Sequence, residues 1–381
     1  MNLFRFIPLV TVVFAAPLCV HAQDDGAPQL DPVVIDALPA NAADSTDTGE
    51  GTSIKQVIER EEFGNSITSL GETLGNRTGV QIRRTGGRGS PSSISIRGSS
   101  SKQVQVYLDG MLLNDPVHGG VDLSLYSLHD IARIEVYPGS PPARFAEAGV
   151  GGVVSLKSMD PKGDPKTRIS VGGGSFDARK AGFFHSGAQD DLSYWFSLNR
   201  QSAQNDFHYE NRQEWYNPND GDQTTRRNAD FEQNDVSGKL GYRIDKNRRV
   251  DALVQWSDRD RGIPSIQNWR DNQARLETRN RRIQMHYQDL GGFDGRLHGS
   301  HRLVVSSREE RYQDLRGRVG TGNYDIRTRT GQFGVNSSLS WIQGQHIVSG
   351  RFKAAHYEQN ERDFLQPVPE IERKRTQLTS A

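Results

Sequence analysis

The sequence predicts an exported protein in which a signal peptide and a small α/β domain precede an antiparallel transmembrane β-barrel. Three observations support this fold class. The N-terminus carries an apolar run of signal-peptide length. Short alternating strands and Gly-rich loops follow it up to about residue 164. The region after residue 164 contains alternating segments joined by short and long connections in turn, which is typical of a membrane-spanning barrel.

Residues 1–22 are predicted to be a secretory signal peptide. Arg5 supplies positive charge, Phe6–Cys19 is apolar, and Ala22 is a small residue at the expected cleavage point. The apolar run is too short to span a bilayer as a helix. Cleavage after Ala22 would remove Cys19, the single cysteine of the chain, so we expect a mature protein without disulfides.

The composition narrows the function without fixing it. Lys plus Arg and Asp plus Glu are both 47, so no global charge directs the protein toward nucleic acid. Hydrophobic residues make up 34% of the chain, and no stretch after the signal peptide reads as an apolar membrane helix. A soluble exported protein and a β-barrel share this composition, so the residue pattern must distinguish them.

Residues 23–53 are predicted to be a flexible periplasmic segment that contains one β-prone island. The segment is rich in Asp, Ala, Thr and Gly and has little to bury. The island consists of Asp31, Pro32, Val33, Val34, Ile35, Asp36, Ala37 and Leu38. An extended peptide of this kind can add as a strand to the sheet edge of a partner. Taken alone, the island fits an incidental apolar patch in a linker equally well.

Residues 54–164 are predicted to fold as a small α/β domain. Ser69–Leu74 reads as a short helix because Ser69 can cap it and Glu72 follows three residues later. The Asp109-Gly110 pair predicts a tight turn. Strands are expected at Val80–Arg83, Ser93–Arg97, Val104–Leu108, Asp130–Val136 and Gly149–Lys157. Two Gly-rich loops, Thr85–Ser92 and Asp115–Asp122, separate them.

The sequence does not predict an enzyme or a cofactor. The loop Thr85–Ser92 lacks the Lys-Ser/Thr pair that would follow in a phosphate-binding loop. His118 and His129 have no second ligand at metal-binding spacing, so we expect both to be solvated loop residues. No Ser–His–Asp arrangement or carboxylate pair stands out for hydrolysis.

The second half shows alternating apolar and polar residues, with the apolar set expected to face lipid and the polar set the lumen. The apolar set comprises Leu192, Tyr194, Phe196, Leu198, Val250, Ala252, Val254, Trp256, Ile283, Met285, Tyr287, Leu303, Val305, Phe333, Val335, Leu339 and Trp341. About ten strands are expected between Thr167 and the end of the chain.

The connections between these strands alternate in length. Short ones are expected at Gly187–Asp191, Asp245–Arg248, Gly291–Asp294 and Gln343–Gln345. Long polar ones are expected at Gln204–Asp230, Asp260–Arg275, Asp314–Asn323 and Arg362–Glu370. Tight periplasmic turns and large outer loops explain this alternation, which a soluble sandwich would not. The first outer connection, Gly172–Phe176, is an exception because it is short.

Residues 31–160 resemble the N-terminal part of the TonB-dependent outer-membrane receptors, motif by motif. The resemblance rests on Ser93–Gly98 (SISIRG), Val104–Gly110 (VQVYLDG) and the Gly-rich Ile134–Ser158, in this order. The loop before Ser93–Gly98 is similar to that of the cobalamin-receptor-like subgroup. One departure is Tyr137–Pro141, where the family has Arg-Gly-Pro, which puts in doubt any salt bridge that the family makes there.

The resemblance implies a bacterial outer-membrane receptor for energised uptake of a scarce substrate, cobalamin or an iron chelate. It makes residues 54–164 the plug domain and Asp31–Leu38 the TonB box, through which TonB would pull. It places Arg97 in a plug–barrel ion pair. Substrate is expected at the loops Gly86–Ser92 and Asn114–Gly120 and at an outer loop, through Arg88, Ser90, Ser92, Asn114, His118, Tyr209, Trp215 and Tyr216.

Further expectations concern ligands and partners. Asp220 and Asp222 are oxygen ligands of the type that calcium prefers, but a solvated turn, NPNDGD, is the preferred explanation. The expected partners are TonB, a small chelate or corrinoid, and outer-membrane lipid, with no nucleic acid.

The family resemblance implies about twenty-two strands, so residues 165–381 are expected to be the N-terminal portion of a truncated barrel. An adhesion barrel without active transport and a non-functional fragment are the alternatives. A signal-transducing receptor would need an extra domain before the box, where only Gln23–Leu30 intervenes.

Overall fold

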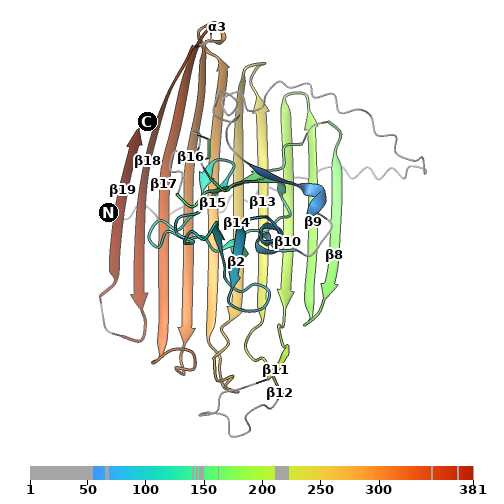
Figure 1. Ribbon diagram of the computed structural model, residues 1–381, viewed down its shortest axis with the longest axis vertical. Helices are drawn as coiled ribbons and strands as arrows, with labels where there is room; N and C mark the ends of the chain where they lie inside the picture. The colour runs from blue at the N-terminus through green and yellow to red at the C-terminus, as the bar shows by residue number, and fades with distance from the viewer. Residues whose placement is uncertain are drawn as a thin grey trace, which may run out of the picture. The chain divides into compact units, whose positions relative to one another are not determined.

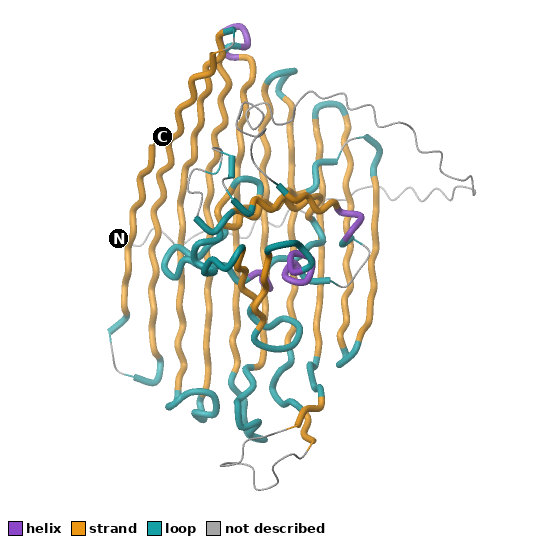
Figure 2. Tube along the Cα trace, in the orientation of Figure 1, coloured by secondary structure: helices purple, strands orange, loops and turns teal. Residues whose placement is uncertain are grey.

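The computed structural model describes residues 55–64, 68–139, 141–142, 145, 150–161, 163–210, 223–344, 346–366 and 369–380. All of them belong to one compact unit, Asn41–Ala381. Figures 1 and 2 show that this unit contains a small α/β domain and one sheet of long strands lying side by side. The signal peptide and Asp31–Leu38 lie outside the described residues.

The α/β domain contains a mixed five-stranded sheet in the order β1-β6-β7-β4-β5. Its strands are β1 (Gln56–Glu59), β4 (Gln105–Leu108), β5 (Met111–Leu112), β6 (Ile131–Tyr137) and β7 (Val153–Ser158). β4 and β7 run parallel, and the other neighbours are antiparallel. The strands β2 (Val80–Arg84) and β3 (Ser92–Ile96) form a separate hairpin. Every expected strand of this domain is therefore present.

The short helix α2 (Leu70–Gly75) begins where the sequence predicted it. The Ser69 hydroxyl accepts a hydrogen bond from the Glu72 N–H at 3.2 Å, and the Glu72 carboxylate accepts one from the Ser69 N–H at 2.9 Å. The other helical segments of this domain are η2 (Arg60–Glu62) and η3 (Leu123–Leu125). Within the described residues, no helix combines the length and the apolar character needed to cross a membrane.

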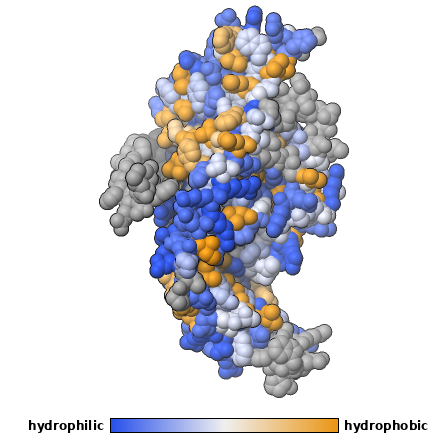
Figure 3. Space-filling view, turned by 90° about the vertical axis from the view of Figure 1, so that its left-hand side faces the viewer, coloured by the Kyte–Doolittle hydropathy of each residue, from blue (hydrophilic) through white to orange (hydrophobic). Residues whose placement is uncertain are grey.

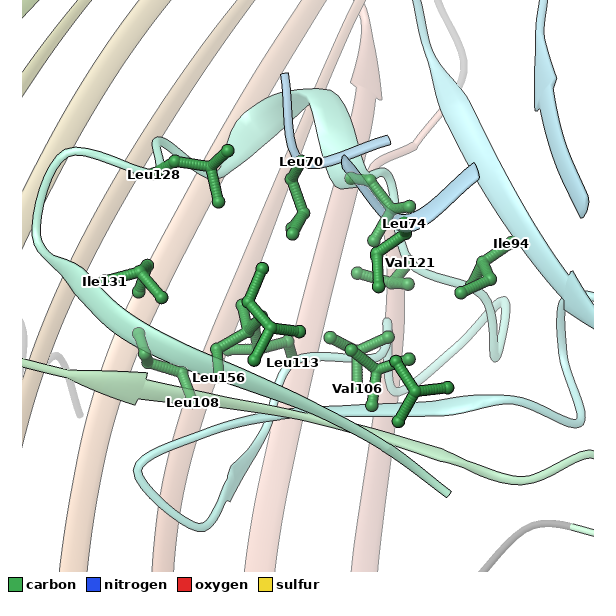
Figure 4. Packing of buried hydrophobic residues seen from close by; sticks show 14 of the residues in the cluster. Leu70, Leu74, Ile94, Val106, Leu108, Leu113, Val121, Leu128, Ile131 and Leu156 are labelled. Atoms are coloured by element: carbon green, nitrogen blue, oxygen red, sulfur yellow. The ribbon is translucent and has the colours of Figure 1, made fainter. Parts of the chain in front are cut away.

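The core of the α/β domain is aliphatic. Leu70 and Leu74 from α2 lie over Val106, Leu108 and Leu156 of the sheet, as Figure 4 shows. All five are at most 1% exposed. The same cluster continues into the large sheet through Phe184, Trp195, Leu253 and Val304, so apolar packing also joins the domain to the sheet.

The α2 cap gives a small stability prediction. Replacing Ser69 with Ala removes the acceptor for the Glu72 N–H, so we expect the domain to lose about 1 kcal/mol of unfolding free energy. Chemical denaturation of the variant and the parent measures the difference. An unchanged midpoint would show that the cap contributes nothing.

The large sheet contains ten strands in the order β19-β18-β17-β16-β15-β14-β13-β10-β9-β8. Each strand pairs antiparallel with its neighbours, and β8 and β19 are the two edges. The strands are β8 (Lys166–Gly174), β9 (Ala178–Gln189), β10 (Leu192–Ala203), β13 (Phe231–Arg243), β14 (Arg248–Gly262), β15 (Arg275–Gly291), β16 (Leu297–Asp314), β17 (Tyr324–Gln343), β18 (His346–Asp363) and β19 (Ile371–Ser380).

The two faces of the large sheet differ as the alternation predicted. One face, here the outward face, exposes Phe196, Leu198, Val254, Trp256, Ile283, Met285, Leu303, Val305, Phe333, Leu339 and Trp341. The other face contacts the α/β domain and buries polar residues such as Gln233, Thr278 and Gln284. Figure 3 accordingly shows hydrophobic residues at the surface among strongly hydrophilic ones. An apolar outward face and a polar inner face suit a barrel wall in lipid.

The connections between the strands also follow the prediction. At one end they are tight, including α3 (Gly292–Gly295), which is a turn because Phe293 and Asp294 have positive φ. At the other end they are long, except for the short turn between β8 and β9, and the connection after β10 contains the small hairpin β11 (His208–Glu210) and β12 (Gln223–Thr225). These ends are called here the short-turn end and the long-loop end.

Candidate functional site

The loop Gly86–Ser92 joins β2 to β3 and is held against the large sheet by one asparagine. Asn205, just after β10, accepts a hydrogen bond from the Arg88 N–H at 3.0 Å and donates one to the Arg88 carbonyl at 2.9 Å. Gly89 has φ +72°, and a Cβ there would collide with the Phe231 ring. The first predicted substrate loop is therefore anchored to the wall by its backbone.

A buried arginine of the sheet binds the same loop. Arg259 of β14 is only 1% exposed. Its Nη1 donates to the Gly89 carbonyl at 3.2 Å and to the Ser124 hydroxyl at 2.6 Å, and its Nη2 donates to the Asp122 carboxylate at 3.2 Å. Burial alone would raise the pKa of Asp122, but Arg259 and the bonds from Ser124 and Ser92 lower it below its usual value. This pair is a charged anchor between the α/β domain and the sheet.

The second predicted substrate loop, Asn114–Gly120, is organised by its own side chains. The Asn114 amide donates to the carbonyls of Val104 and Gly119 and accepts from the Val106 N–H, all within 2.9 Å. Asp115 accepts from the backbone N–H groups of Val117 and His118. The polar atoms of Asn114 therefore serve the loop itself, whereas the ring of His118 is exposed.

Two other strands of the large sheet, β16 and β19, contact this second loop. Arg308 of β16 lies 3.7 Å from the Asp115 carboxylate, and Arg375 of β19 donates to the Pro116 carbonyl at 3.0 Å. The two predicted substrate loops thus lie against different parts of the sheet, and each is bound there by an arginine of the wall.

A further set of contacts lies toward the short-turn end. Asp109 accepts hydrogen bonds from the Ser158 N–H and hydroxyl at 2.9 and 2.5 Å and faces Lys239 of β13 at 3.6 Å. Burial would raise the pKa of Asp109, but Lys239 and Ser158 hold it below its usual value. Arg249 of β14 pairs with Asp160 at 2.6 Å. Charged pairs therefore join the two bodies at both ends of their contact.

The expected role of Arg97 is not met within the described residues. Its side chain is exposed and forms no ion pair with a described carboxylate. The cause is local, because Arg97 and Gly98 both have positive φ and turn the chain out of the β3 alternation. The described plug–barrel ion pairs instead join plug carboxylates to basic side chains of the sheet, as in Arg259–Asp122 and Lys239–Asp109.

A cavity of about 50 Å³ lies between the α/β domain and the sheet. Its lining combines apolar residues such as Leu108, Ile131 and Leu156 with the polar residues His129, Asp130, Asn199, Asp235, Gln255 and Arg282. His129 is 5% exposed, so the expectation of a solvated loop residue was wrong. Burial, with Arg168 and Lys180 nearby, lowers the pKa of His129 to about 4. His129 is therefore neutral at physiological pH.

Asp130 in this cavity gives a pH prediction. Burial, aided by the charge of Asp235, raises the pKa of Asp130 to about 6. Between about pH 4 and pH 6 the folded state keeps a proton on Asp130 that the unfolded chain has already released. The stability that the protonated Asp130 gives the folded state is therefore lost as the pH rises through 6. We expect Asp130→Asn to increase the unfolding free energy by about 2–3 kcal/mol at pH 8 and by little at pH 4.

Thermal unfolding of the Asp130→Asn variant at both pH values tests this. The matched control is Asp109→Asn, which should destabilise at pH 8 because the Asp109 pKa is lowered. Equal effects of Asp130→Asn at both pH values would contradict a proton on Asp130.

The other predicted site residues are only partly described. Tyr209 contacts Phe207, and the Arg226 guanidinium lies 5.6 Å from the Tyr209 ring centre. Trp215, Tyr216, Asp220 and Asp222 lie outside the described residues. In the part of the chain that the structure describes, no group of three or more His, Cys, Asp or Glu residues could hold a metal ion.

Asn205, Arg259 and Lys239 were not among the residues predicted from the sequence. Each stands at an inward position of its strand or just beyond it, next to ordinary polar residues, and its partner is more than 80 residues away. An Arg or Lys on the polar side of an alternating strand was the available signal.

Comparison with known proteins agrees with this architecture. Residues 47–153 match the family model described as the TonB-dependent receptor plug domain. The chain is 30% identical over 171 residues to the vitamin B12 transporter BtuB of Vibrio vulnificus, which covers 45% of this chain and 27% of that protein. It is 33% identical over 123 residues to BtuB of Vibrio cholerae. The chain thus spans about a quarter of the length of these curated relatives.

Solved structures share the fold at low sequence identity. The ferripyoverdine receptor of the Pseudomonas aeruginosa outer membrane superposes with a TM-score of 0.63 at 12% identity, covering 86% of this chain and 48% of that one. The copper transporter OprC gives a TM-score of 0.64 at 13% identity, with 82% and 48% covered. At these identities the likeness shows the fold, with the α/β domain and the large sheet in one arrangement.

Proposed function

We propose that the chain is part of a TonB-dependent receptor of the bacterial outer membrane and that the whole protein takes up a scarce substrate, cobalamin or an iron chelate. The α/β domain acts as the plug, and the large sheet is part of the wall around it. The curated relatives are named as vitamin B12 transporters, which favours a corrinoid. No covalent step is part of this function.

The observation that carries the proposal is a small domain attached to the sheet by many polar contacts. Most of the domain's core lies on its own elements, and only Phe184, Trp195, Leu253 and Val304 of the sheet join it. The remaining contacts with the sheet include ion pairs and hydrogen bonds at Arg259, Lys239 and Asn205. Polar contacts can be exchanged for water when the domain shifts, because water replaces their hydrogen bonds. Such a domain can open a path without unfolding its core.

The proposed drive comes through Asp31–Leu38. This peptide would add as a strand to a sheet edge of TonB, and a pull on it would reach the α/β domain at β1, which follows it in the chain. β1 pairs with β6, whose preceding residue is Asp130 in the cavity between the domain and the sheet. The pull would therefore act close to the wall contacts that must break.

A growth assay with the full-length gene tests the proposal. Cells that lack their own corrinoid and iron-chelate receptors receive the gene and are supplied with cobalamin or with single iron chelates. We expect growth on cobalamin that is lost when Asp31–Leu38 is deleted. Growth on an iron chelate alone would reassign the substrate. Substrate binding without any growth would favour the adhesion barrel.

A further inference from the structure

Three arginines stand directly opposite one another on neighbouring strands of the large sheet. Arg311 of β16 pairs in register with Arg327 of β17, and Arg327 pairs with Arg362 of β18. Like charges in directly opposed positions destabilise a sheet. This arginine ladder therefore needs compensation from a partner or from an anion.

The protein compensates the arginine ladder only in part. Arg311 makes a two-pronged ion pair with Asp325, with both N–O distances at 2.9 Å. Arg327 and Arg362 form no ion pair with a described carboxylate. Their guanidinium carbons lie 4.9 and 5.0 Å from the centre of the Phe364 ring, and that of Arg311 lies 5.7 Å away. One ring thus gathers three cations.

The geometry around Phe364 keeps the guanidinium groups together. The Phe364 N–H donates to the Asp325 carbonyl at 2.9 Å, which fixes the ring beside the Arg311–Asp325 pair. An aromatic face attracts the plane of a guanidinium, whose N–H donors lie at its edge. The stacked arginines can therefore still donate hydrogen bonds to an acceptor with several oxygens. Phe364 remains 41% exposed, so the site is accessible.

The arginine ladder lies on the outward face of the sheet, above the apolar residues. It shares the side-chain parity of Leu303, Val305, Phe333 and Phe352, which are exposed on that face. Trp341 on the same face of β17 is about fourteen residues away toward the short-turn end. At about 3.3 Å per residue and a tilt of about 40°, this separation is about 35 Å along the membrane normal. A bilayer with its headgroups is about 40–45 Å thick, so the ladder reaches headgroup level if Trp341 lies at the opposite interface.

We propose that Arg311, Arg327, Arg362 and Phe364 form a binding site for the phosphate groups of an anionic lipid headgroup in the outer leaflet. Guanidinium groups recognise phosphate by paired N–H donors, and two of the three here, Arg327 and Arg362, form no ion pair with a described carboxylate. The apolar residues of the outward face lie below the arginine ladder on the same surface. One lipid molecule would therefore place its chains against these residues and its phosphates against the arginines. The site is separate from the substrate loops, which lie on the other face.

The test uses the full-length protein in neutral-detergent micelles. The probe is a bis-phosphorylated glucosamine-disaccharide lipid, compared with the same lipid after removal of both phosphates. We expect Arg327→Gln with Arg362→Gln to weaken binding of the phosphorylated lipid about 10- to 30-fold, since each basic residue near an anionic surface contributes about fivefold or more. Binding of the dephosphorylated lipid should be weak in the parent and unchanged in the variant.

The matched control is Arg179→Gln with Arg200→Gln. Both residues are exposed near the long-loop ends of β9 and β10, but each has its own carboxylate partner. The control removes the same charge and should change binding less than twofold. A second variant, Phe364→Ala, keeps every charge and should weaken binding several-fold, because no aromatic ring then holds the three guanidinium groups together.

Three results would overturn the proposal. An equal loss of lipid binding in the Arg327/Arg362 and the Arg179/Arg200 double variants would mean that net charge alone attracts the lipid. Equal binding of the dephosphorylated lipid would remove phosphate from the recognition. Displacement of the lipid by an equal concentration of inorganic phosphate would make this a site for the free ion. The uptake assay is independent of these outcomes, so the proposed function stands or falls separately.

Discussion

Replacing Arg259 with Ala is expected to weaken the attachment of the α/β domain to the large sheet by about 3–5 kcal/mol. The change leaves Asp122, whose side chain is only 17% exposed, without its cation, and it removes the donors to Gly89 and Ser124. A cysteine placed at Ser90 reports the attachment, because its labelling by a thiol reagent rises when the loop leaves the wall. The urea concentration at half-labelling should fall strongly.

Two controls define the Arg259 effect. Arg275→Ala removes a rim pair with Asp230 and Asp260 that is about one-third exposed, so it should cost less than about 1 kcal/mol. Adding Asp122→Ala to Arg259→Ala should recover part of the loss, since no buried charge is then left unpaired. Identical labelling curves for Arg259→Ala and the parent would show that this anchor is not what holds the loop.

Replacing Ile35 with Pro is expected to abolish energised uptake while substrate binding at the cell surface persists. Proline removes a backbone donor in the middle of the strand that TonB would pair with. The proposed substrate loops belong to the α/β domain and the sheet, which this change does not touch. Labelled substrate measures binding in de-energised cells and uptake in energised cells. The control is Ala27→Pro, which lies before Asp31–Leu38 and should leave both quantities unchanged.

Local patterns predicted most of the fold because they act between residues close in sequence. The Ser69–Glu72 cap, the Asp109-Gly110 turn and the alternating faces of the long strands all depend on short-range geometry. The alternation of short and long connections followed from the same patterns. The number of strands was also correct, since about ten were expected and the large sheet has ten.

The site was harder to predict because its contacts join distant residues. Arg259 and Asp122 are 137 positions apart, and Asn205 and Arg88 are 117 apart. No short-range pattern marks such pairs. His129 shows the same limit, because a loop position suggested solvent while packing against Gly182 of β9 buries it. Arg97 was predicted to form a plug–barrel ion pair from family resemblance. The positive φ of Arg97 and Gly98 instead turns the chain out of the β3 alternation at this position.

Uptake of labelled cobalamin by cells that carry the full-length protein tests the central claim most directly. The account predicts accumulation that requires both TonB and the proton-motive force. It also predicts that removing either one leaves binding at the surface intact. Accumulation that continues without TonB, or surface binding that never leads to accumulation in energised cells with any corrinoid or iron chelate, would contradict the account.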